Sequence, residues 1–383
     1  MATILKSALQ RPTSSFQWLR TGEEALATML TAIRAATESI RLETYIFSEG
    51  PLANEFRDEL TAAAQRGLKV QVMVDSMGSI SLSDAYWNSF RKAGGEFTFF
   101  NPLTLNRWSY RDHRKLMVCD SKIAFIGGFN IAEEYRGDGV KSGWRDLGLQ
   151  VAGPLVDELA ESFDQFFSNA NMLHKRLQNL MPARDKVTLG QNWKLILNGP
   201  GLNHAALKRS FVQDLQTSKN VKIICAYFLP TWRLRKAIIA VTKRGGKVQL
   251  ILAGKSDVLL SHLATRRLYR SFLRAGVEIH EYQPQVLHAK MFILDDVVYA
   301  GSANMDVRSL RINYELLVRV SDTALAEGAR EMFSKDLTHC QRIDAAGWRT
   351  SRNFLTKLKE KWAYFVLARL DPYLARRQLK YLR

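Results

Sequence analysis

Two stretches of this chain share one pattern: DHRKLMVCDSKIAFIGGFN at 112–130 and LHAKMFILDDVVYAGSAN at 287–304. Both reduce to His-x-Lys, four residues, Asp, and then Gly-Gly or Gly-Ser followed by x-Asn. A single His-x-Lys carries little information, but two copies with matched Asp, Gly and Asn indicate a duplicated functional site. The residues of the two copies are His113, Lys115, Asp120, Gly127, Gly128 and Asn130, and His288, Lys290, Asp295, Gly301, Ser302 and Asn304.

The similarity between the two halves extends upstream of these stretches. KVQVMVD at 69–75 corresponds to KVQLILA at 247–253, and both are typical of buried strands. Gly67 and Gly245 each follow a helical pattern and are placed to end that helix. The order of elements predicts two similar α/β domains, each a mostly parallel sheet flanked by helices. Near the start of each half, apolar residues at helical spacing predict a further helix. They are Leu26, Met29, Leu30 and Ile33 in the first half, and Leu207, Phe211 and Leu215 in the second.

The duplication divides the 383 residues into three parts. We predict a first domain at 1–180, a second domain at 181–345 and a tail at 346–383. The polar segment 174–192 contains Pro and Gly and is predicted to connect the two domains. Each domain then carries one His-x-Lys motif.

Composition and charge exclude several classes of protein. Hydrophobic residues make up 46% of the chain, too many for a disordered protein, and three cysteines favour a reducing compartment over a disulfide framework. The N-terminal region lacks the apolar stretch of a secretory signal, and the apolar run at 362–370 is about half as long as a membrane span. The net charge of +18 predicts attraction to a polyanion, either nucleic acid or an anionic membrane.

The residue types of the repeated motif suit a phosphate ester. His and Lys two residues apart on a strand project from one face, so the ammonium can neutralise phosphoryl oxygens while the imidazole attacks or moves a proton. Lysine is not a zinc ligand, so we expect no metal and no cofactor. Asparagine adds a neutral donor, and the small Gly-Gly or Gly-Ser pair lets the backbone approach a ligand. The predicted phosphate-binding residues are Lys115, Lys290, Asn130, Asn304 and Ser302.

Two carboxylates are candidates to orient the histidines. Asp146 lies 33 residues after His113, and Glu315 lies 27 residues after His288. Each precedes a Leu-rich run that resembles a strand, so the two positions look equivalent. We expect each carboxylate to hold one histidine ring, as the aspartate does in a Ser-His-Asp triad.

The paired signatures resemble the HKD motifs of the phospholipase D superfamily over about residues 15–340. The resemblance implies a bilobed fold with one active site at a pseudo-two-fold interface. It also implies a metal-independent ping-pong reaction through a phosphohistidine, in which the second histidine acts as general acid and base. By this carry-over we expect His113 to be the nucleophile and His288 the acid and base, although the sequence itself is symmetric on this point.

The resemblance also gives the repeated aspartates a place in the motif. Because Asp120 and Asp295 lie five residues after their lysines, we expect them to face away from the site and to tie down the backbone between strand and loop. Glu43, Tyr45 and Tyr227 end equivalent strands and either line the cleft or pack in the core. The full catalytic set implied by the motif is His113, Lys115, Asp120, His288, Lys290 and Asp295.

Within the superfamily, LETYIF at 42–47, AAAQRG at 62–67 and AYFLP at 226–230, together with both motifs, are most similar to bacterial cardiolipin synthases of the shorter type. That resemblance implies transfer of a phosphatidyl group from phosphatidylglycerol to a second lipid alcohol, giving cardiolipin. The alternatives are a phospholipase D-type hydrolase and a nuclease. The expected partner is an anionic membrane containing phosphatidylglycerol, on the cytoplasmic face of the bacterial inner membrane, with no nucleic acid. The oligomeric state stays open.

The tail at 346–383 matches nothing in the first half. Phe354, Leu358, Trp362 and Phe365 follow a helical stripe, and basic residues lie mostly off it. A basic amphipathic helix with aromatic residues is typical of an interfacial membrane anchor. The alternative is that the stripe packs on the core of the protein itself.

Overall fold

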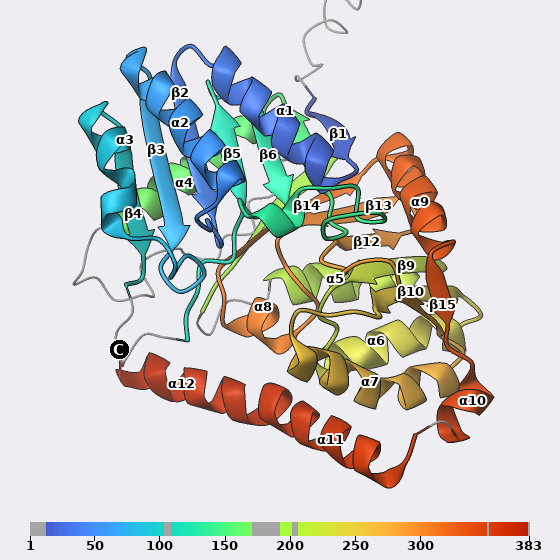
Figure 1. Ribbon diagram of the computed structural model, residues 1–383. Helices are drawn as coiled ribbons and strands as arrows, with labels where there is room; N and C mark the ends of the chain where they lie inside the picture. The colour runs from blue at the N-terminus through green and yellow to red at the C-terminus, as the bar shows by residue number, and fades with distance from the viewer. Residues whose placement is uncertain (1–12, 103–108, 171–191, 201–205, 351, 382–383) are drawn as a thin grey trace, which may run out of the picture.

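The computed structural model of the chain describes residues 13–102, 109–170, 192–200, 206–350 and 352–381 (Figure 1). Within these residues the chain forms two sheets, each flanked by helices, and a helical tail. The predicted connection at 174–192 lies outside the described residues apart from its last position, and so does the predicted boundary at 180–181.

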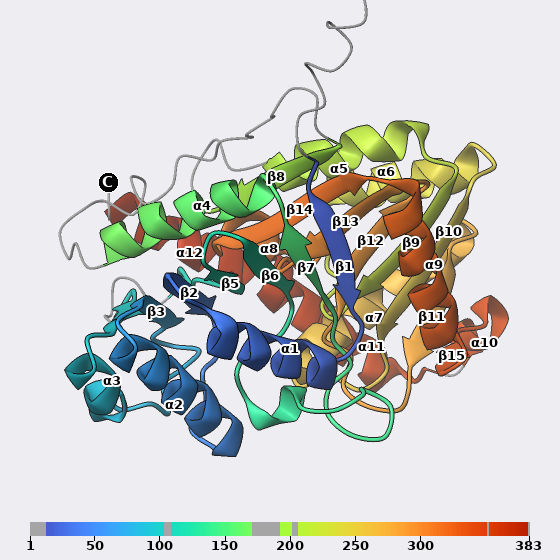
Figure 2. The ribbon, with the colours of Figure 1, turned by 90° about the horizontal axis from the view of Figure 1, so that it is seen from above.

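The first domain contains a seven-stranded sheet with the order β1-β7-β6-β5-β2-β3-β4. Helices α1 and α2 cover one face and α4 covers the other, as Figure 2 shows. The elements are β1 (Ser15–Leu19), α1 (Gly22–Ala35), β2 (Ser39–Thr44), α2 (Pro51–Gln65), β3 (Lys69–Asp75), η1 (Asp84–Trp87), α3 (Asn88–Lys92), β4 (Glu96–Phe100), β5 (Leu116–Cys119), β6 (Ile123–Gly127), η2 (Glu133–Tyr135), β7 (Gly148–Ala152) and α4 (Leu155–Ala170).

The second domain repeats this plan in an eight-stranded sheet with the order β15-β11-β10-β9-β12-β13-β14-β8. Its elements are β8 (Trp193–Asn198), α5 (Ala206–Thr217), β9 (Asn220–Cys225), α6 (Trp232–Lys243), β10 (Lys247–Ala253), α7 (Leu259–Arg274), β11 (Glu278–Tyr282), β12 (Lys290–Leu294), β13 (Val297–Gly301), α8 (Val307–Arg311), β14 (Glu315–Ser321), α9 (Thr323–Leu337) and β15 (Cys340–Arg342). The tail consists of α10 (Ala345–Thr350), α11 (Phe354–Phe365), the π-helical turn η4 (Val366–Leu370) and α12 (Asp371–Tyr381).

The helices predicted from apolar spacing are present in both domains. The four apolar residues predicted for the first helix are buried in α1, and the three predicted for its counterpart are buried in α5. Gly67 and Gly245 follow α2 and α6 with φ angles of +88° and +82°. Only glycine adopts this left-handed conformation without strain, so both glycines end their helices as predicted.

Both sheets are mixed, which corrects the expectation of mostly parallel sheets. Parallel pairing is confined to β2-β3-β4 and β9-β10-β11. The remaining pairs are antiparallel, because each His-x-Lys motif leads into a hairpin, β5–β6 or β12–β13. Asp120 and Asp295 lie at the turns of these hairpins with φ angles of 54° and 52°. A buried antiparallel strand has the same continuous apolar sequence as a buried parallel strand. The sequence therefore does not reveal that the strands of these hairpins run antiparallel.

The two domains share one continuous hydrophobic core. Residues of α4 and β5–β7 pack in the same cluster as residues of β12–β14 and α9. In Figure 2, α9 lies beside β1 of the first domain. There Trp18 donates a hydrogen bond from Nε1 to the carbonyl of Leu325, at 3.1 Å. The shared core therefore fixes one domain against the other.

A buried ion pair crosses the same interface. Arg145 forms a bidentate pair with Asp336 of α9, with both N–O distances at 2.8 Å and both side chains 5% exposed. The guanidinium also donates to the backbone carbonyls of Arg20 and Asp146. Removing one partner of such a pair leaves an uncompensated buried charge, so the pair ties the segment around Asp146 to the second domain.

We expect Asp336→Ala to lower the free energy of unfolding by about 3–5 kcal/mol, because it leaves Arg145 buried without its counter-charge. The matched control is Asp296→Ala, which removes the exposed partner of Arg330 and should cost less than about 1 kcal/mol. Urea unfolding followed by circular dichroism measures both variants. Equal costs would show that the Arg145 pair contributes no more than a surface pair.

Candidate active site

Both motif histidines line one cavity of about 420 Å³ between the domains. Asn130 and Asn304 line it as well. Asp371 of the tail also borders the cavity and pairs with Arg308 at 2.6 Å. The cavity is therefore walled by both domains and the tail. Its apolar lining residues are Ile46, Met77, Trp144, Leu229, Val258, Val307 and Leu367.

Each motif histidine is held by a carboxylate from the other domain. Nδ1 of His113 lies 3.1 Å from Oε2 of Glu315, and Nδ1 of His288 lies 2.7 Å from Oδ2 of Asp146. A carboxylate only accepts, so each Nδ1 carries the proton and each Nε2 presents its lone pair. The structure thus exchanges the partners that proximity in the sequence suggests.

Backbone hydrogen bonds across the interface produce this exchange. The main-chain N–H of His113 donates to the carbonyl of Tyr314 at 3.0 Å, and that of His288 donates to the carbonyl of Arg145 at 2.8 Å. Tyr314 and Arg145 are the residues directly before the two carboxylates. Each histidine is therefore attached by its backbone to the segment that carries its carboxylate partner.

The second small residue of each motif supports a carboxylate. Ser302 donates its hydroxyl to Oε2 of Glu315 and is not part of the cavity lining. A side-chain carbon at Gly128 would fall 2.2 Å from Oδ1 of Asp146, so only glycine leaves room there. Both small residues thus serve the carboxylates, because Ser302 hydrogen-bonds Glu315 and Gly128 leaves space for Asp146. We propose that neither contacts the phosphate directly.

The two motif lysines lie against the histidines and outside the cavity lining. Nζ of Lys115 donates to the carbonyl of His113 at 2.7 Å. Nζ of Lys290 lies 2.8 Å from Nδ1 and 3.0 Å from Nε2 of His288, and it also donates to the carbonyl of that residue. An ammonium in this position would lie beside a phosphoryl group held at the histidine.

The two asparagines hold the loops that end β2 and β9. Oδ1 of Asn130 accepts from the main-chain N–H of Ile46 at 3.0 Å, and Oδ1 of Asn304 accepts from that of Tyr227 at 3.3 Å. Because each side-chain oxygen is engaged, the amide nitrogen is the group left to donate toward a ligand. Asn130 uses one of its two N–H groups on the hydroxyl of Tyr135, at 2.6 Å.

Tyrosines complete the wall around the histidines. The hydroxyl of Tyr135 lies 3.4 Å from Nε2 of His288, and the ring of Tyr45 lies 5.1 Å from that of His113. Tyr45 and Tyr227 line the cavity, whereas Glu43 is buried in the first domain and pairs with Arg114 at 2.9 Å. Tyr135 was missed because it has no tyrosine counterpart in the second half, so the repeat could not reveal it.

The motif aspartates lie outside the cavity lining, at the far ends of their strands. The carboxylate of Asp120 accepts from the main-chain N–H groups of Thr37, Glu38 and Ser39, and that of Asp295 accepts from the corresponding turn before β9. Each carboxylate joins its hairpin turn to the start of a neighbouring strand. This position supports a backbone-tying role for both residues, and we propose that neither takes a direct part in catalysis.

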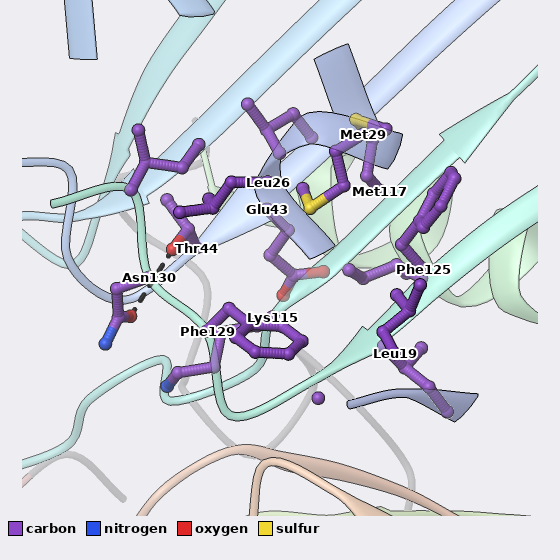
Figure 3. A pocket seen from close by; sticks show the side chains of 15 residues that line it. Leu19, Leu26, Met29, Glu43, Thr44, Lys115, Met117, Phe125, Phe129 and Asn130 are labelled. Carbon is purple, nitrogen blue, oxygen red and sulfur yellow. Dashed lines mark hydrogen bonds between the residues drawn. The ribbon is translucent and has the colours of Figure 1, made fainter. Parts of the chain in front are cut away.

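A much smaller cavity of about 20 Å³ lies inside the first domain (Figure 3). Core side chains such as Leu26 and Met29 form most of its wall. Figure 3 shows Thr44 donating to Oδ1 of Asn130, at 3.4 Å, with Lys115 nearby. Asn130 lines both cavities and so separates them. This inner cavity has a mostly apolar lining and is poorly suited to a phosphate.

Burial controls the charge of the site. It lowers the pKa of His113 and of His288, and the neighbouring lysine charges add to this effect while the carboxylates oppose it in part. Burial, with repulsion from Lys290, also lowers the pKa of Lys115 to about 7. The pKa of Lys290 is lowered by burial as well. At neutral pH both histidines are therefore uncharged in the free protein.

The arrangement can carry out displacement at phosphorus. An uncharged imidazole with its Nδ1 proton held by a carboxylate is a nucleophile or a base, and the opposite imidazole can carry the proton of a leaving group. Ammonium and amide donors close to the histidines can stabilise charge on phosphoryl oxygens. Within the described residues, no group of three or more His, Cys, Asp or Glu side chains is placed to hold a metal ion.

We expect kcat/KM for a phosphodiester substrate to fall as pH rises through about 7, because Lys115 is an ammonium only below its lowered pKa. In the substrate complex the phosphate charge favours the ammonium, so kcat should hold to higher pH. Initial rates across pH 5–10 would measure the alkaline decline of kcat/KM and that of kcat. Lys115→Arg, which stays charged, should lose the alkaline limb even if its maximal rate falls. A limb that persists in this variant would contradict the assignment.

We expect Glu315→Gln to lower kcat by about four orders of magnitude, because the neutral amide no longer fixes the Nδ1 proton of His113. Asp120→Ala is the matched control from the same motif. It should leave kcat of the folded protein unchanged and lower the free energy of unfolding by about 1–3 kcal/mol, because main-chain donors lose their acceptor. Single-turnover rates and urea unfolding separate the two effects. A large fall in kcat for Asp120→Ala would return that residue to the catalytic set.

Comparison with known proteins identifies relatives that cover most of the chain. Residues 29–168 and 211–337 match the family described as "Cardiolipin synthase, PLD-like domain". A cardiolipin synthase of Clostridium perfringens (strain SM101 / Type A) is 30% identical over 345 residues, covering 87% of this chain and 72% of that protein. Cardiolipin synthase B of Escherichia coli (strain K12) is 29% identical over 344 residues, covering 87% of this chain and 83% of the relative.

Solved structures share the fold at much lower identity. The phosphatidylserine synthase of Haemophilus influenzae Rd KW20 superposes with a TM-score of 0.75 at 16% identity, covering 94% of both chains. A polyphosphate kinase from Porphyromonas gingivalis gives 0.59 at 15% identity, covering 96% of this chain and 53% of that one. Because the family model matches both domains and the Clostridium relative is 30% identical over most of its length, the chain belongs to the cardiolipin synthase family with phospholipase D-like domains.

Proposed function

We propose that this chain is a cardiolipin synthase, which transfers the phosphatidyl group of one phosphatidylglycerol to a hydroxyl of another and releases glycerol. The observation that carries the proposal is the pair of histidines, each held by a buried carboxylate and both facing one cavity. The names of the Clostridium and Escherichia relatives support the same reaction. With domains at 1–180 and 181–345, each domain supplies one histidine and also the carboxylate that holds the histidine of the other domain.

In the first step, Nε2 of His113 attacks the phosphorus of the donor lipid. The new N–P bond forms as the bond from phosphorus to the glycerol oxygen breaks. His288 gives that oxygen a proton, so glycerol leaves as the neutral alcohol. The bound phosphodiester is negatively charged and raises the pKa of His288 above its value in the free protein, which makes the protonated form available.

In the second step, the hydroxyl of the second phosphatidylglycerol attacks the phosphohistidine. His288, now neutral, accepts the hydroxyl proton as the new O–P bond forms and the N–P bond to His113 breaks. The product is cardiolipin and both histidines return to their starting state. Water in place of the lipid alcohol gives phosphatidic acid by the same route.

The lysines and asparagines would stabilise the charge that develops on the phosphoryl oxygens in both steps. Lys290 is already within 3.0 Å of Nε2 of His288, and Lys115 packs against His113. Asn130 and Asn304 offer amide N–H groups from opposite domains. Donors fixed by the fold need no rearrangement as charge develops, which makes them effective.

The composition of the cavity supports a lipid substrate. The lining combines the polar groups of the motifs with apolar side chains such as Met77, Val258 and Leu367. An amphiphile can place its phosphodiester at the former and its glycerol backbone against the latter. A nucleic acid would instead need basic groups along the cavity wall to match its row of phosphates.

We further propose that the protein works peripherally at an anionic membrane that contains phosphatidylglycerol, on the cytoplasmic face of the bacterial inner membrane. Its net charge of +18 supports attraction to that surface. The three cysteines are unpaired, which suits a reducing compartment. No helix in the described part of the chain has the length and apolarity needed to cross a bilayer.

The reaction is tested by incubating the purified full-length chain with phosphatidylglycerol vesicles and identifying products by mass spectrometry. We expect cardiolipin and glycerol in equal amounts, since each transfer releases one glycerol. Phosphatidic acid as the main product would favour hydrolysis, and nicking of plasmid DNA without lipid turnover would favour a nuclease. Either outcome would replace the proposed reaction.

The roles of the two histidines can be separated by trapping. With phosphatidylglycerol radiolabelled in its phosphate, we expect His288→Asn to retain covalent label, because His113 can still attack while the second step is slowed. His113→Asn should retain none, because the nucleophile is missing. A quench in sodium dodecyl sulfate at mildly alkaline pH preserves the acid-labile N–P bond, and gel autoradiography then measures the label. Label in His113→Asn alone would reverse the assignment.

A further inference from the structure

A strongly basic groove lies outside the catalytic cavity, where α6, α7 and α11 meet. Its volume is about 460 Å³, and no acidic residue lines it. In Figure 1, α11 runs beneath α7 along the outside of the second domain. The six cations that line this basic groove are Arg235, Arg267, Arg270, Arg274, Lys361 and Arg369.

None of the six cations of the basic groove forms an ion pair with a carboxylate in the described part of the protein. The nearby acids are already used, because Glu281 pairs with Arg266 and Glu360 pairs with Arg352. Helices α6 and α7 together contain eight lysines and arginines and no acidic residue. Like charges three and four residues apart on one helix face repel each other. A bound anion would remove this repulsion.

One groove side chain also lacks a hydrogen-bond acceptor. Nε of Arg235 is buried and has no partner in the fold, although its guanidinium lies 6.0 Å from the ring centre of Tyr364. A buried N–H without an acceptor is unfavourable. Arg235 lines the basic groove, so an anion oxygen there is well placed to accept this bond.

The apolar stripe of the tail borders the basic groove. Helix α11 packs on the second domain through Ala363 and the partly buried Tyr364, while Phe354 and Trp362 are 76% and 61% exposed. Phe365 is 55% exposed and also lines the groove. The helix thus packs on the core by a different face from the predicted stripe, and the stripe faces outward. Exposed aromatic residues beside cations are typical of a membrane interface.

We propose that the basic groove binds the phosphate headgroup of an anionic phospholipid and, together with the exposed stripe of α11, docks the protein on the bilayer. A lipid fits better than nucleic acid because the cations adjoin apolar side chains that a bilayer can bury. On the other side of the tail helix, Leu367 and Asp371 line the catalytic cavity. Groove and cavity therefore flank one helix about 10 Å wide and can face the same membrane surface.

This site is separate from the proposed reaction, because none of its residues lines the catalytic cavity. Its test therefore measures binding without turnover. The full-length triple variant Arg270→Gln, Arg274→Gln, Lys361→Gln removes three groove charges. The matched control Lys69→Gln, Lys92→Gln, Lys335→Gln removes three exposed charges from β3, α3 and α9, which lie away from the groove in Figure 1.

Flotation compares binding to vesicles of phosphatidylcholine alone and of phosphatidylcholine mixed with phosphatidylglycerol. We expect the groove variant to bind the mixed vesicles roughly 100-fold more weakly than the wild type, and the control variant to bind nearly as tightly. Arg270→Lys with Arg274→Lys should keep most of the binding, because it keeps the charge. The melting temperature of the groove variant should be unchanged or higher, because repulsion is relieved, which separates lost binding from lost folding.

Three results would overturn the proposal. The first is equal binding of the groove and control variants to the mixed vesicles. The second is that inorganic phosphate stabilises the wild type but not the groove variant while vesicle binding is unchanged, which would assign the groove to a free phosphate. The third is loss of duplex DNA binding in the groove variant with vesicle binding intact, which would assign it to nucleic acid.

Discussion

A hydrogen bond between a histidine of one domain and a carboxylate of the other, made twice, is the constraint on which this structure depends. Each bond requires the two domains to stay in fixed register, because a hydrogen bond tolerates only a few tenths of an ångström. The shared core, the buried Arg145–Asp336 pair and the backbone bonds that precede each carboxylate all maintain that register. Neither domain alone contains a complete histidine pair with its supports.

The protein uses positive charge in two physically different ways. In the cavity, burial removes water from the lysines and histidines, so their charge depends on pH and on whether a phosphate is present. Along α7 and α11 the cations are largely exposed and keep their charge whether or not an anion is bound. The first arrangement suits chemistry on one phosphate, and the second suits attraction to a surface.

Much of this could be predicted from the sequence because the chain repeats itself. Repetition revealed both motifs, the helices and their glycine ends, and the two candidate carboxylates. It could not reveal what differs between the halves or what joins them. Tyr135 has no counterpart in the second half. The exchange of Asp146 and Glu315 depends on backbone contacts between the domains. The hydrogen bond from Ser302 to Glu315 is visible only in the structure. The antiparallel hairpins could not be predicted, because an apolar run looks the same in a parallel and in an antiparallel strand.

The crossed pairs also impose an order in time. Domains made on the ribosome tend to fold from the N-terminus onward. His113 is synthesised 202 residues before Glu315, and Asp146 is synthesised 142 residues before His288. Neither hydrogen bond can therefore form until the second domain has been made. Asp371, which closes the cavity wall through Arg308, follows later still. A partly synthesised chain therefore lacks the assembled site until Glu315 has been made.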